Sequence, residues 1–441
     1  MSSAIIAKPI DNFRKAAKAG QAHIMRGLIT GKQEMAGGKF KEVKKINPNA
    51  KDKKKNTPLH YSVGDPESIQ LLIDAKANIN AQNKNKETPL HNAILQNVKA
   101  SVELLINNKA DVNAMSKKGS PLNYAIKNNH NDLAELLLKS GADVNGKDKQ
   151  DFTSLQWAIF NDKDDVVNLL LKFNADPNIE TKNSTALKIA IHKKNAKAVE
   201  TLIKAKADVN HVDKNGQTAL YFSLSNGENT IGEILIKAKA DVNKANKDGK
   251  TPLGLAIKKN DVKLIETLIK AKADVNKVNG NGMAPLIHAY RKQNSKMVEL
   301  LIKNKADVNV KDADGNTLLH YATKSEDLKL MKTLIKAKVN VDMPGKDAHT
   351  PLFVALYSQK SKAAILLIKS GADTNQKNAK GDTPLILVAA KGYTDIAKAL
   401  LSKGAKVNMK SAQGYTPLLI ASHFKHKELA ELLEKKGGKK K

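Results

Sequence analysis

The sequence predicts an all-α solenoid, in which short helix–turn–helix units stack and a β-hairpin-like loop projects from each junction. The main observation is a nonapeptide, LIKAKADVN, that begins at Leu202, Leu235 and Leu268, each copy 33 residues after the last. A second motif, typified by TPLGLAI at Thr251, occurs twelve times, and the last seven intervals are all 33 residues. A fixed period indicates a structural unit that packs on copies of itself, and the low aromatic content of 4% suits many small helix contacts.

Four segments follow one another along the chain. Residues 1–29 are expected to form a divergent helix pair that caps the array, and residues 30–50, rich in Lys and Gly, a basic flexible insertion. The repeat array is expected at residues 51–436, with twelve repeats, and a basic tail at residues 437–441. The inward-facing side chains of the capping pair are expected to be Phe13, Ala16, Ile24 and Leu28. The basic side chains expected on its polar outer face are Lys15, Lys18 and Arg26.

The unit at Thr251 shows how one repeat is expected to fold. Thr251 is an N-cap residue and Pro252 suits the first helical position, because its φ is preset and its missing N–H is not needed there. Apolar side chains recur at helical spacing in two runs, separated by the letters KKND. The runs are Leu253, Ala256 and Ile257, then Val262, Ile265, Leu268 and Ile269. Two short antiparallel helices follow from this pattern, and the stretch KVNGNGM predicts a tight projecting loop.

These motifs resemble those of the ankyrin-repeat family, whose period is 33 residues and whose signature is T-P-L-H-x-A followed by a G-A-D-V-N-like exit. TPLH stands at Thr57–His60 and Thr88–His91. The A-D-V-N exit stands at Ala110–Asn113, Ala142–Asn145, Ala207–Asn210, Ala240–Asn243, Ala273–Asn276 and Ala306–Asn309. The resemblance implies an ankyrin-repeat solenoid of helix–turn–helix units.

One departure from the family pattern recurs before the exit. The family has glycine there, where the chain turns through positive φ, and this chain keeps it at Gly141, Gly371 and Gly404. Lysine stands instead at Lys76, Lys109, Lys206, Lys239, Lys272, Lys305 and Lys338. We expect these lysines to adopt the same left-handed geometry, which destabilises the fold by about 1 kcal/mol at each position.

The charge of the chain is strongly basic but consists almost wholly of lysine. The 441 residues carry a formal net charge of +31, and arginine occurs only at Arg14, Arg26 and Arg291. Lysine attracts phosphate as a point charge, whereas bidentate reading of phosphates and bases is a property of arginine. The charge therefore indicates at most non-specific attraction to polyanions, and the codon composition of an AT-rich genome explains it more simply.

No residue pattern supports an enzymatic, cofactor or metal site. Neither G-x-x-x-x-G-K-[ST] nor G-x-G-x-x-G occurs, the eleven histidines show no metal-ligand spacing, and there is no cysteine. His60, His91 and His320 occupy equivalent repeat positions, which favours hydrogen-bonded structural roles. We therefore predict that the chain is not an enzyme and has no catalytic residue, no cofactor and no bound metal.

The resemblance implies that a partner protein binds on the concave groove of the solenoid. In the family, partner-contacting positions follow the T-P-L motif by about seven residues or lie near the loop tips. Here these positions are Phe152, Phe160, His192, Lys193, Lys258, Lys259, Arg291, Lys292, Tyr357, Tyr415, His423 and Phe424. For each aromatic residue, filling the space between helices is an equally good interpretation. We expect a monomeric scaffold for an unidentified protein with acidic surfaces, and non-specific binding of nucleic acid or an anionic membrane surface is the alternative.

Modification and location are further expectations. The exits resemble substrates of 2-oxoglutarate-dependent asparaginyl hydroxylases, because a leucine stands eight residues before each candidate asparagine. The candidates are Asn210, Asn243 and Asn276, although the turn requires asparagine there equally. The N-terminus has no apolar leader and no apolar run approaches the roughly 20 residues of a membrane helix, so we expect a cytoplasmic protein without a signal peptide or transmembrane segment. Composition and family habit also leave open delivery into a host cell by an intracellular microbe.

Overall fold

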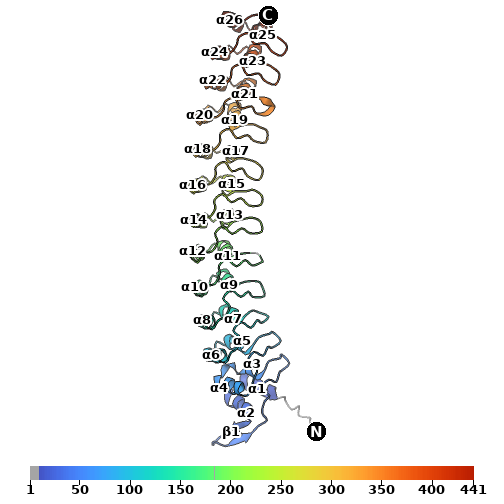
Figure 1. Cartoon of the computed structure of the whole chain (residues 1–441), viewed down its shortest axis with the longest axis vertical. Coiled ribbons are helices and arrows are strands. Elements are labelled where there is room, and N and C mark those ends of the chain that lie inside the picture. The colour runs from blue at the N-terminus through green and yellow to red at the C-terminus, as the bar shows by residue number, and fades with distance from the viewer. Residues whose placement is uncertain (1–8, 183) are drawn as a thin grey trace. The chain divides into compact units, whose positions relative to one another are not determined.

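A computed structural model describes residues 9–182 and 184–441 (Figure 1). Within these ranges the chain forms 26 α-helices, two short strands and two 3-10 turns, so the predicted all-α class is confirmed. The chain divides into two compact units, Met1–Val209 and Asn210–Lys441, which we describe separately. In each unit short helices pair antiparallel, and we call the two members of a pair the first and the second helix.

The described part of the first unit contains twelve helices and a hairpin. Its first helices are α1 Pro9–Lys18, α3 Pro58–Tyr61, α5 Pro89–Leu95, α7 Pro121–Lys127, α9 Ser154–Phe160 and α11 Ala186–His192. Its second helices are α2 Ala22–Thr30, α4 Pro66–Asp74, α6 Lys99–Asn107, α8 Asn131–Lys139, α10 Asp164–Lys172 and α12 Ala196–Lys204. Strands β1 Lys32–Glu34 and β2 Phe40–Glu42 follow α2, and the 3-10 turn η1 Ser62–Gly64 follows α3.

The second unit contains fourteen helices in seven pairs. Its first helices are α13 Ala219–Ser225, α15 Pro252–Lys258, α17 Pro285–Arg291, α19 Leu318–Ser325, α21 Pro351–Tyr357, α23 Pro384–Lys391 and α25 Pro417–His423. Its second helices are α14 Asn229–Lys237, α16 Val262–Lys270, α18 Ser295–Lys303, α20 Leu328–Lys336, α22 Ser361–Lys369, α24 Thr394–Ser402 and α26 Lys427–Lys435. The 3-10 turn η2 Lys346–Ala348 lies in the loop before α21.

The pair α15 and α16 has the predicted capping. The Oγ1 of Thr251 accepts a hydrogen bond of 3.0 Å from the backbone N–H of Gly254, and Pro252 occupies the first turn. Asp261 caps α16 by accepting from the N–H of Leu264 at 3.0 Å. These caps satisfy amide groups that a helix leaves without an internal partner, so each short helix begins at a residue that its sequence specifies.

Within each unit, first helices pack on first helices and second helices on second helices. In the first unit α5 contacts α7 and α4 contacts α6, and in the second α23 contacts α25 and α22 contacts α24. In Figure 1 the second helices of each unit form one row, the first helices a second row, and the loops project beyond them. The core lies between the rows, where residues such as Leu268 and Ile257 are fully buried. Each such side chain contributes about 2 kcal/mol to the free energy of unfolding.

The asparagine of the A-D-V-N exit links each repeat to the next. In the second unit, the Oδ1 of Asn243 accepts from the backbone N–H of Asp274 at 2.7 Å, and its Nδ2 donates to the carbonyl of Lys272 at 3.2 Å. Asn276 makes the same two bonds one repeat later, to Asp307 and Lys305. Because the partners come from the following repeat, these bonds form only when the repeats stack.

The lysines that replace glycine before the exit have the expected left-handed geometry. Their φ angles are 65° at Lys76, 66° at Lys109, 65° at Lys206, 63° at Lys239, 66° at Lys272, 66° at Lys305 and 62° at Lys338. The prediction made from the family pattern is confirmed. At each of these seven positions the fold therefore keeps a side chain in a backbone conformation that favours glycine.

We expect Lys239→Gly to leave the free energy of unfolding unchanged or to raise it by up to about 1 kcal/mol. Glycine removes the strain of the left-handed backbone, but it also increases the entropy of the unfolded chain, which offsets part of the gain in stability. Urea denaturation measures the effect. Lys237→Gly is the matched control: this lysine is the last residue of α14, and glycine there is expected to lower stability by about 1 kcal/mol. A clear fall in the midpoint for Lys239→Gly would contradict the assigned role of the backbone geometry.

The N-terminal helix pair packs on the first repeat through α1 on α3 and α2 on α4. Phe13 and Ala16 are buried as expected, but α2 buries Met25 and Ile29, whereas Ile24 and Leu28 are half-buried. Arg26 also differs from the expected outer-face position. Its guanidinium donates to both carboxylate oxygens of Asp65, at 3.2 and 3.0 Å, and lies 2.7 Å from Glu67. Because Asp65 and Glu67 stand at the start of α4, this face of α2 turns toward the first repeat.

The segment at residues 30–50, which we expected to be a flexible insertion, contains an antiparallel hairpin of β1 and β2. The hairpin continues α2 directly, with the N–H of Val43 donating to the carbonyl of Gly31 at 3.0 Å. Ile46 is buried, and its N–H donates to the carbonyl of Leu28 at 2.9 Å. At the other end of the chain, the N–H of Lys439 donates to the Oδ1 of Asn408 at 2.7 Å, so the segment predicted as a tail takes part in the asparagine linkage.

Candidate functional site

Three of the residues predicted to contact a partner gather at one groove of the second unit. This C-terminal groove, about 520 Å³ in volume, lies between α23 and α25. Tyr415, His423 and Phe424 line it together with Ile386, Leu387, Ala390, Leu419 and Ile420. Tyr415 is 51% exposed and Phe424 is 54% exposed. The ring of His423 meets that of Phe424 edge-on at 5.1 Å. The groove therefore combines an apolar floor with two large aromatic side chains open to solvent.

A second groove of the same unit contains Tyr357. This lysine-rich groove, about 420 Å³ in volume, lies beside the ends of α19 and α21 and carries Lys324, Lys346 and Lys380. The ring of Tyr357 lies 5.0 Å from that of His349, and its hydroxyl oxygen accepts from the Nδ2 of Asn378 at 2.7 Å. Burial raises the pKa of Tyr357, so the hydroxyl stays protonated and can donate to a ligand.

In the first unit, Phe152 and Phe160 form a separate aromatic pair with ring centroids 6.3 Å apart. Phe160 is 49% exposed, and the ammonium of Lys193 lies 5.4 Å from its ring centroid. The same ammonium lies 2.9 Å from the carboxylate of Asp162, at the end of α9. Lys193 thus crosses from one repeat to the preceding one, where its charge is already paired.

Two further predicted contact residues have structural partners. The ammonium of Lys259 donates to the carbonyls of Leu224 at 2.6 Å and Ser225 at 3.0 Å, which belong to the last turn of α13. A cation at the C-terminal end of a helix satisfies carbonyls that lack internal partners. Arg291 lies 3.4 Å from the carboxylate of Asp312. The other predicted positions, His192, Lys258 and Lys292, are exposed.

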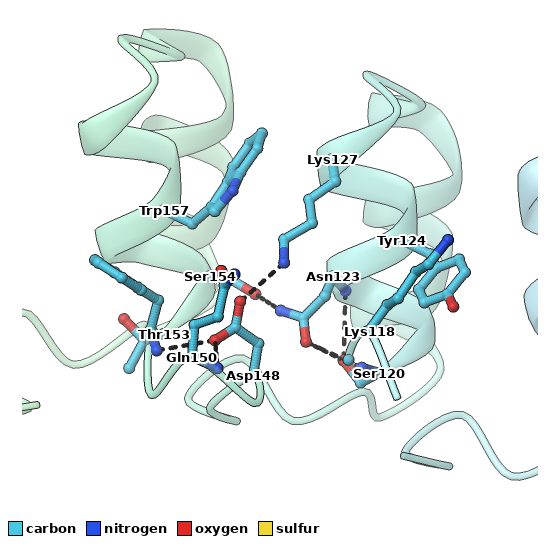
Figure 2. Close-up of polar contacts among 12 residues, drawn as sticks. Lys118, Ser120, Asn123, Tyr124, Lys127, Asp148, Gln150, Thr153, Ser154 and Trp157 are labelled. Carbon is cyan, nitrogen blue, oxygen red and sulfur yellow. Dashed lines mark hydrogen bonds and ion pairs between the residues drawn. The ribbon is translucent and has the colours of Figure 1, made fainter. Parts of the chain in front are cut away.

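Polar side chains near the start of the first helices form a network that the sequence analysis did not identify. On α7, Asn123 accepts from the N–H of Ser120 at 3.0 Å and donates to the hydroxyl of Ser154 on α9 at 2.9 Å (Figure 2). Lys127, also on α7, lies 2.8 Å from the carboxylate of Asp148, whose side chain is only 2% exposed. The signal was a polar residue at the third position after some of the N-caps, such as Asn123 after Ser120 and Gln156 after Thr153. The network joins neighbouring repeats, and its hydrogen-bond donors and acceptors are paired with other groups of the protein.

A family model described as ankyrin repeats (3 copies) matches seven overlapping segments of the chain. The matched residues are 62–148, 110–181, 155–246, 187–279, 233–312, 286–378 and 352–441. The chain belongs to the ankyrin-repeat family. Ankyrin repeats are protein–protein interaction modules, and the family is generally non-enzymatic. Among curated proteins no match to this chain was found.

The histidines of this ankyrin-repeat chain at the T-P-L-H position are structural, as predicted. In His91, Nδ1 accepts from the backbone N–H of Thr88 at 3.1 Å, and Nε2 donates to the carbonyl of Gly119 at 3.3 Å. His60 and His320 make equivalent bonds to their own N-cap threonines and to the next repeat. Burial lowers the pKa of all three imidazoles, that of His91 to about 4.

The asparagines proposed for hydroxylation lie in the loops that link the ankyrin repeats. Asn210 and Asn276 are exposed and Asn243 is half-buried. Their side-chain oxygens each accept from the aspartate N–H of the following repeat at 2.7 Å. These bonds account for the residue type without any modification, which is the alternative that the sequence left open.

Metal-ligand clusters and membrane-spanning helices are both absent from the described residues. No group of three or more His, Asp or Glu side chains there is arranged to hold a metal ion. Among the helices of residues 9–182 and 184–441, none has the length and apolar character that crossing a membrane requires.

Proposed function

We propose that this ankyrin-repeat chain is a non-enzymatic scaffold that binds a protein partner in the C-terminal groove. The observation that carries the proposal is the open apolar groove flanked by Tyr415 and Phe424, each about half exposed. Large aromatic side chains in apolar pockets dominate the binding energy of protein interfaces. Phe160, which is 49% exposed, is a separate candidate contact residue of the first unit.

Several features of this groove support a protein partner. Leu387, Leu419 and Ile420 in its apolar floor are half-buried, whereas Ile386 beneath them is buried, and partly exposed apolar surface of this kind marks interaction sites. Asp382 and His423 at the rim supply hydrogen-bonding groups that orient a partner. No lysine lines this groove, so a partner bound there is held by apolar burial and hydrogen bonds rather than by general positive charge.

The test is affinity capture from nuclease-treated lysate at about 0.15 M and about 0.5 M salt, because electrostatic attraction between exposed charges weakens with salt whereas apolar anchors persist. We expect a defined protein to survive the higher salt and to be lost with Tyr415→Ala/Phe424→Ala. The matched control is Met35→Ala/Phe40→Ala, which removes two apolar side chains of the hairpin that are 50% and 66% exposed. Capture of the same protein by Tyr415→Ala/Phe424→Ala would overturn the proposal. Recovery of nucleic acid alone at low salt would favour the polyanion alternative.

A further inference from the structure

The lysine-rich groove differs from its neighbours in charge. Lys324 on α19, Lys346 in η2 and Lys380 in the next loop all line it, against one carboxylate, that of Asp347. None of these three ammonium groups forms an ion pair with any residue that the structure describes. The charges therefore converge on one groove from α19, from η2 and from the loop before α23, and they stay available to a ligand.

The loop that forms one wall of this groove breaks the local pattern of the array. In the loops before and after it, an Asx residue, Asp312 or Asn378, accepts from the backbone N–H groups two and four residues later. Gly345 stands at the equivalent position and cannot accept in this way. The N–H of Lys346 donates to the side-chain Oδ1 of Asn316 in the preceding repeat at 3.0 Å, whereas the equivalent N–H of Lys247 donates to the backbone carbonyl of Asn215.

The backbone of this loop is also strained. Ala348 has a φ of 58° at the position where Gly315 and Gly381, one repeat away on either side, have φ angles of 80° and 79°. Asp347, directly before it, has a φ of 54°. Two consecutive residues other than glycine in the left-handed region strain the loop, and strain of this kind clusters at functional sites. The strained loop presents Lys346 and His349 to the groove.

We propose that the lysine-rich groove binds an acidic segment of a protein partner, with carboxylates paired to Lys324, Lys346 and Lys380. Tyr321 and Tyr357 line the same groove and offer aromatic surface for the stems of the bound side chains. This inference rests on the proposed function, since it assumes that the chain binds proteins, and it assigns a charge class to the partner at a second groove.

Carboxylates fit this groove better than phosphates. Specific phosphate sites use the bidentate geometry of arginine, and none of the three arginines of the chain lines the groove. The lysines come from three separate elements, which suits several carboxylates spread along an extended peptide. Each ion pair between a lysine of the groove and a carboxylate of the peptide lies partly open to solvent. It therefore contributes to specificity and to the rate of association more than to affinity.

The test uses the full chain and a pool of fluorescein-labelled peptides about a dozen residues long, with four glutamates at fixed positions and neutral residues elsewhere, at about 0.15 M salt. A second pool has glutamine in place of glutamate. The groove variant is Lys324→Gln/Lys346→Gln/Lys380→Gln. The matched control is Lys237→Gln/Lys270→Gln/Lys303→Gln, which makes the same charge change at the exposed last residues of α14, α16 and α18.

We expect the glutamate pool to bind the natural chain and to lose about tenfold in affinity with the groove variant, but less than about twofold with the control. Asp347→Asn is expected to strengthen binding by about twofold, because it removes the competing carboxylate from the groove. Circular dichroism melting checks that all variants remain folded.

Several outcomes would overturn the inference. Equal losses in the two triple variants would mean general surface attraction, and equal binding of the glutamine pool would mean that charge is not recognised. Absence of peptide binding at concentrations up to about 100 µM would also reject the inference. So would a triple lysine variant of the groove that binds duplex DNA more weakly than the natural chain does but binds the peptides equally well. If the partner captured through Tyr415 and Phe424 still binds the groove variant unchanged, this inference fails while the proposed function stands.

Discussion

Acidification to about pH 4 is expected to lower the free energy of unfolding by about 3 kcal/mol through His91 alone, because burial lowers the pKa of its imidazole from 6.5 to about 4. The imidazole is fully buried, and Nδ1 accepts a hydrogen bond from the N–H of Thr88. A proton on Nδ1 would face that N–H and break the cap of α5. The folded protein therefore binds the proton less readily than the unfolded chain.

The sign and the pH range follow from this difference. Above a pH of about 6.5 the imidazole is neutral in both states, and stability is complete. As the pH falls toward 4, the unfolded chain takes up the proton and the folded protein does not, so the free energy of unfolding decreases. His60 and His320 have lowered pKa values for the same reason and add to the effect in the same direction.

His91→Gln isolates this contribution. Gln156 occupies the equivalent position in another repeat, where its Oε1 accepts from the N–H of Thr153 at 3.1 Å and its Nε2 donates to the carbonyl of Ser184 at 3.3 Å. Glutamine thus keeps both bonds and cannot titrate. Urea denaturation at neutral pH should place the variant within about 1 kcal/mol of the natural chain, and at acidic pH the variant should be more stable. Equal losses of stability on acidification would show that His91 does not titrate as its burial implies.

The second large effect is expected at the N-terminal helix pair, where Phe13→Ala should lower the free energy of unfolding by about 3 to 5 kcal/mol. Phe13 is fully buried, and α1 packs on both α2 and α3. Removal of the ring leaves a cavity among α1, α2 and α3. We expect the pair to detach from the first repeat and to become sensitive to protease.

Limited proteolysis with mass spectrometry measures this release, and urea denaturation measures the stability. Phe40→Ala is the matched control, because Phe40 is 66% exposed on β2 and its loss should change stability by less than about 0.5 kcal/mol. Unchanged stability of Phe13→Ala, or cleavage after residue 30 in the natural chain at the same rate, would argue against a capping role for the pair.

Part of the candidate site could be predicted from the repeat register. Tyr415, His423 and Phe424 stand at the positions that the family uses for contacts, and the structure gathers them at one groove. The register did not identify the groove floor, because Leu419 stands at a repeat position where Phe353 and Ile386 are buried. It also missed the lysine-rich groove, where Lys324, Lys346 and Lys380 come from three elements.

The sequence by itself determined the features that depend on neighbours along the chain. Thr251 and Pro252 start a helix wherever they stand, and Lys239 must turn through positive φ because its own loop requires it. The period of these local signals specified the all-α ankyrin-repeat fold before any contact was known. Such interactions join residues a few positions apart, so a short window of sequence contains both partners.

Only the tertiary structure decided which side chains remain available to a ligand. Lys259 and Lys258 look equivalent in the sequence, yet Lys259 holds the carbonyls of Leu224 and Ser225, more than thirty residues earlier. Arg291 likewise forms an ion pair with Asp312 in the next loop. The physical reason is that stacking brings the end of one repeat against the next, so the ammonium of Lys259 meets carbonyls about one period earlier and the guanidinium of Arg291 meets a carboxylate 21 residues later. Packing between repeats therefore decides whether a charged side chain is paired within the fold or exposed to a ligand. No local sequence pattern encodes that packing.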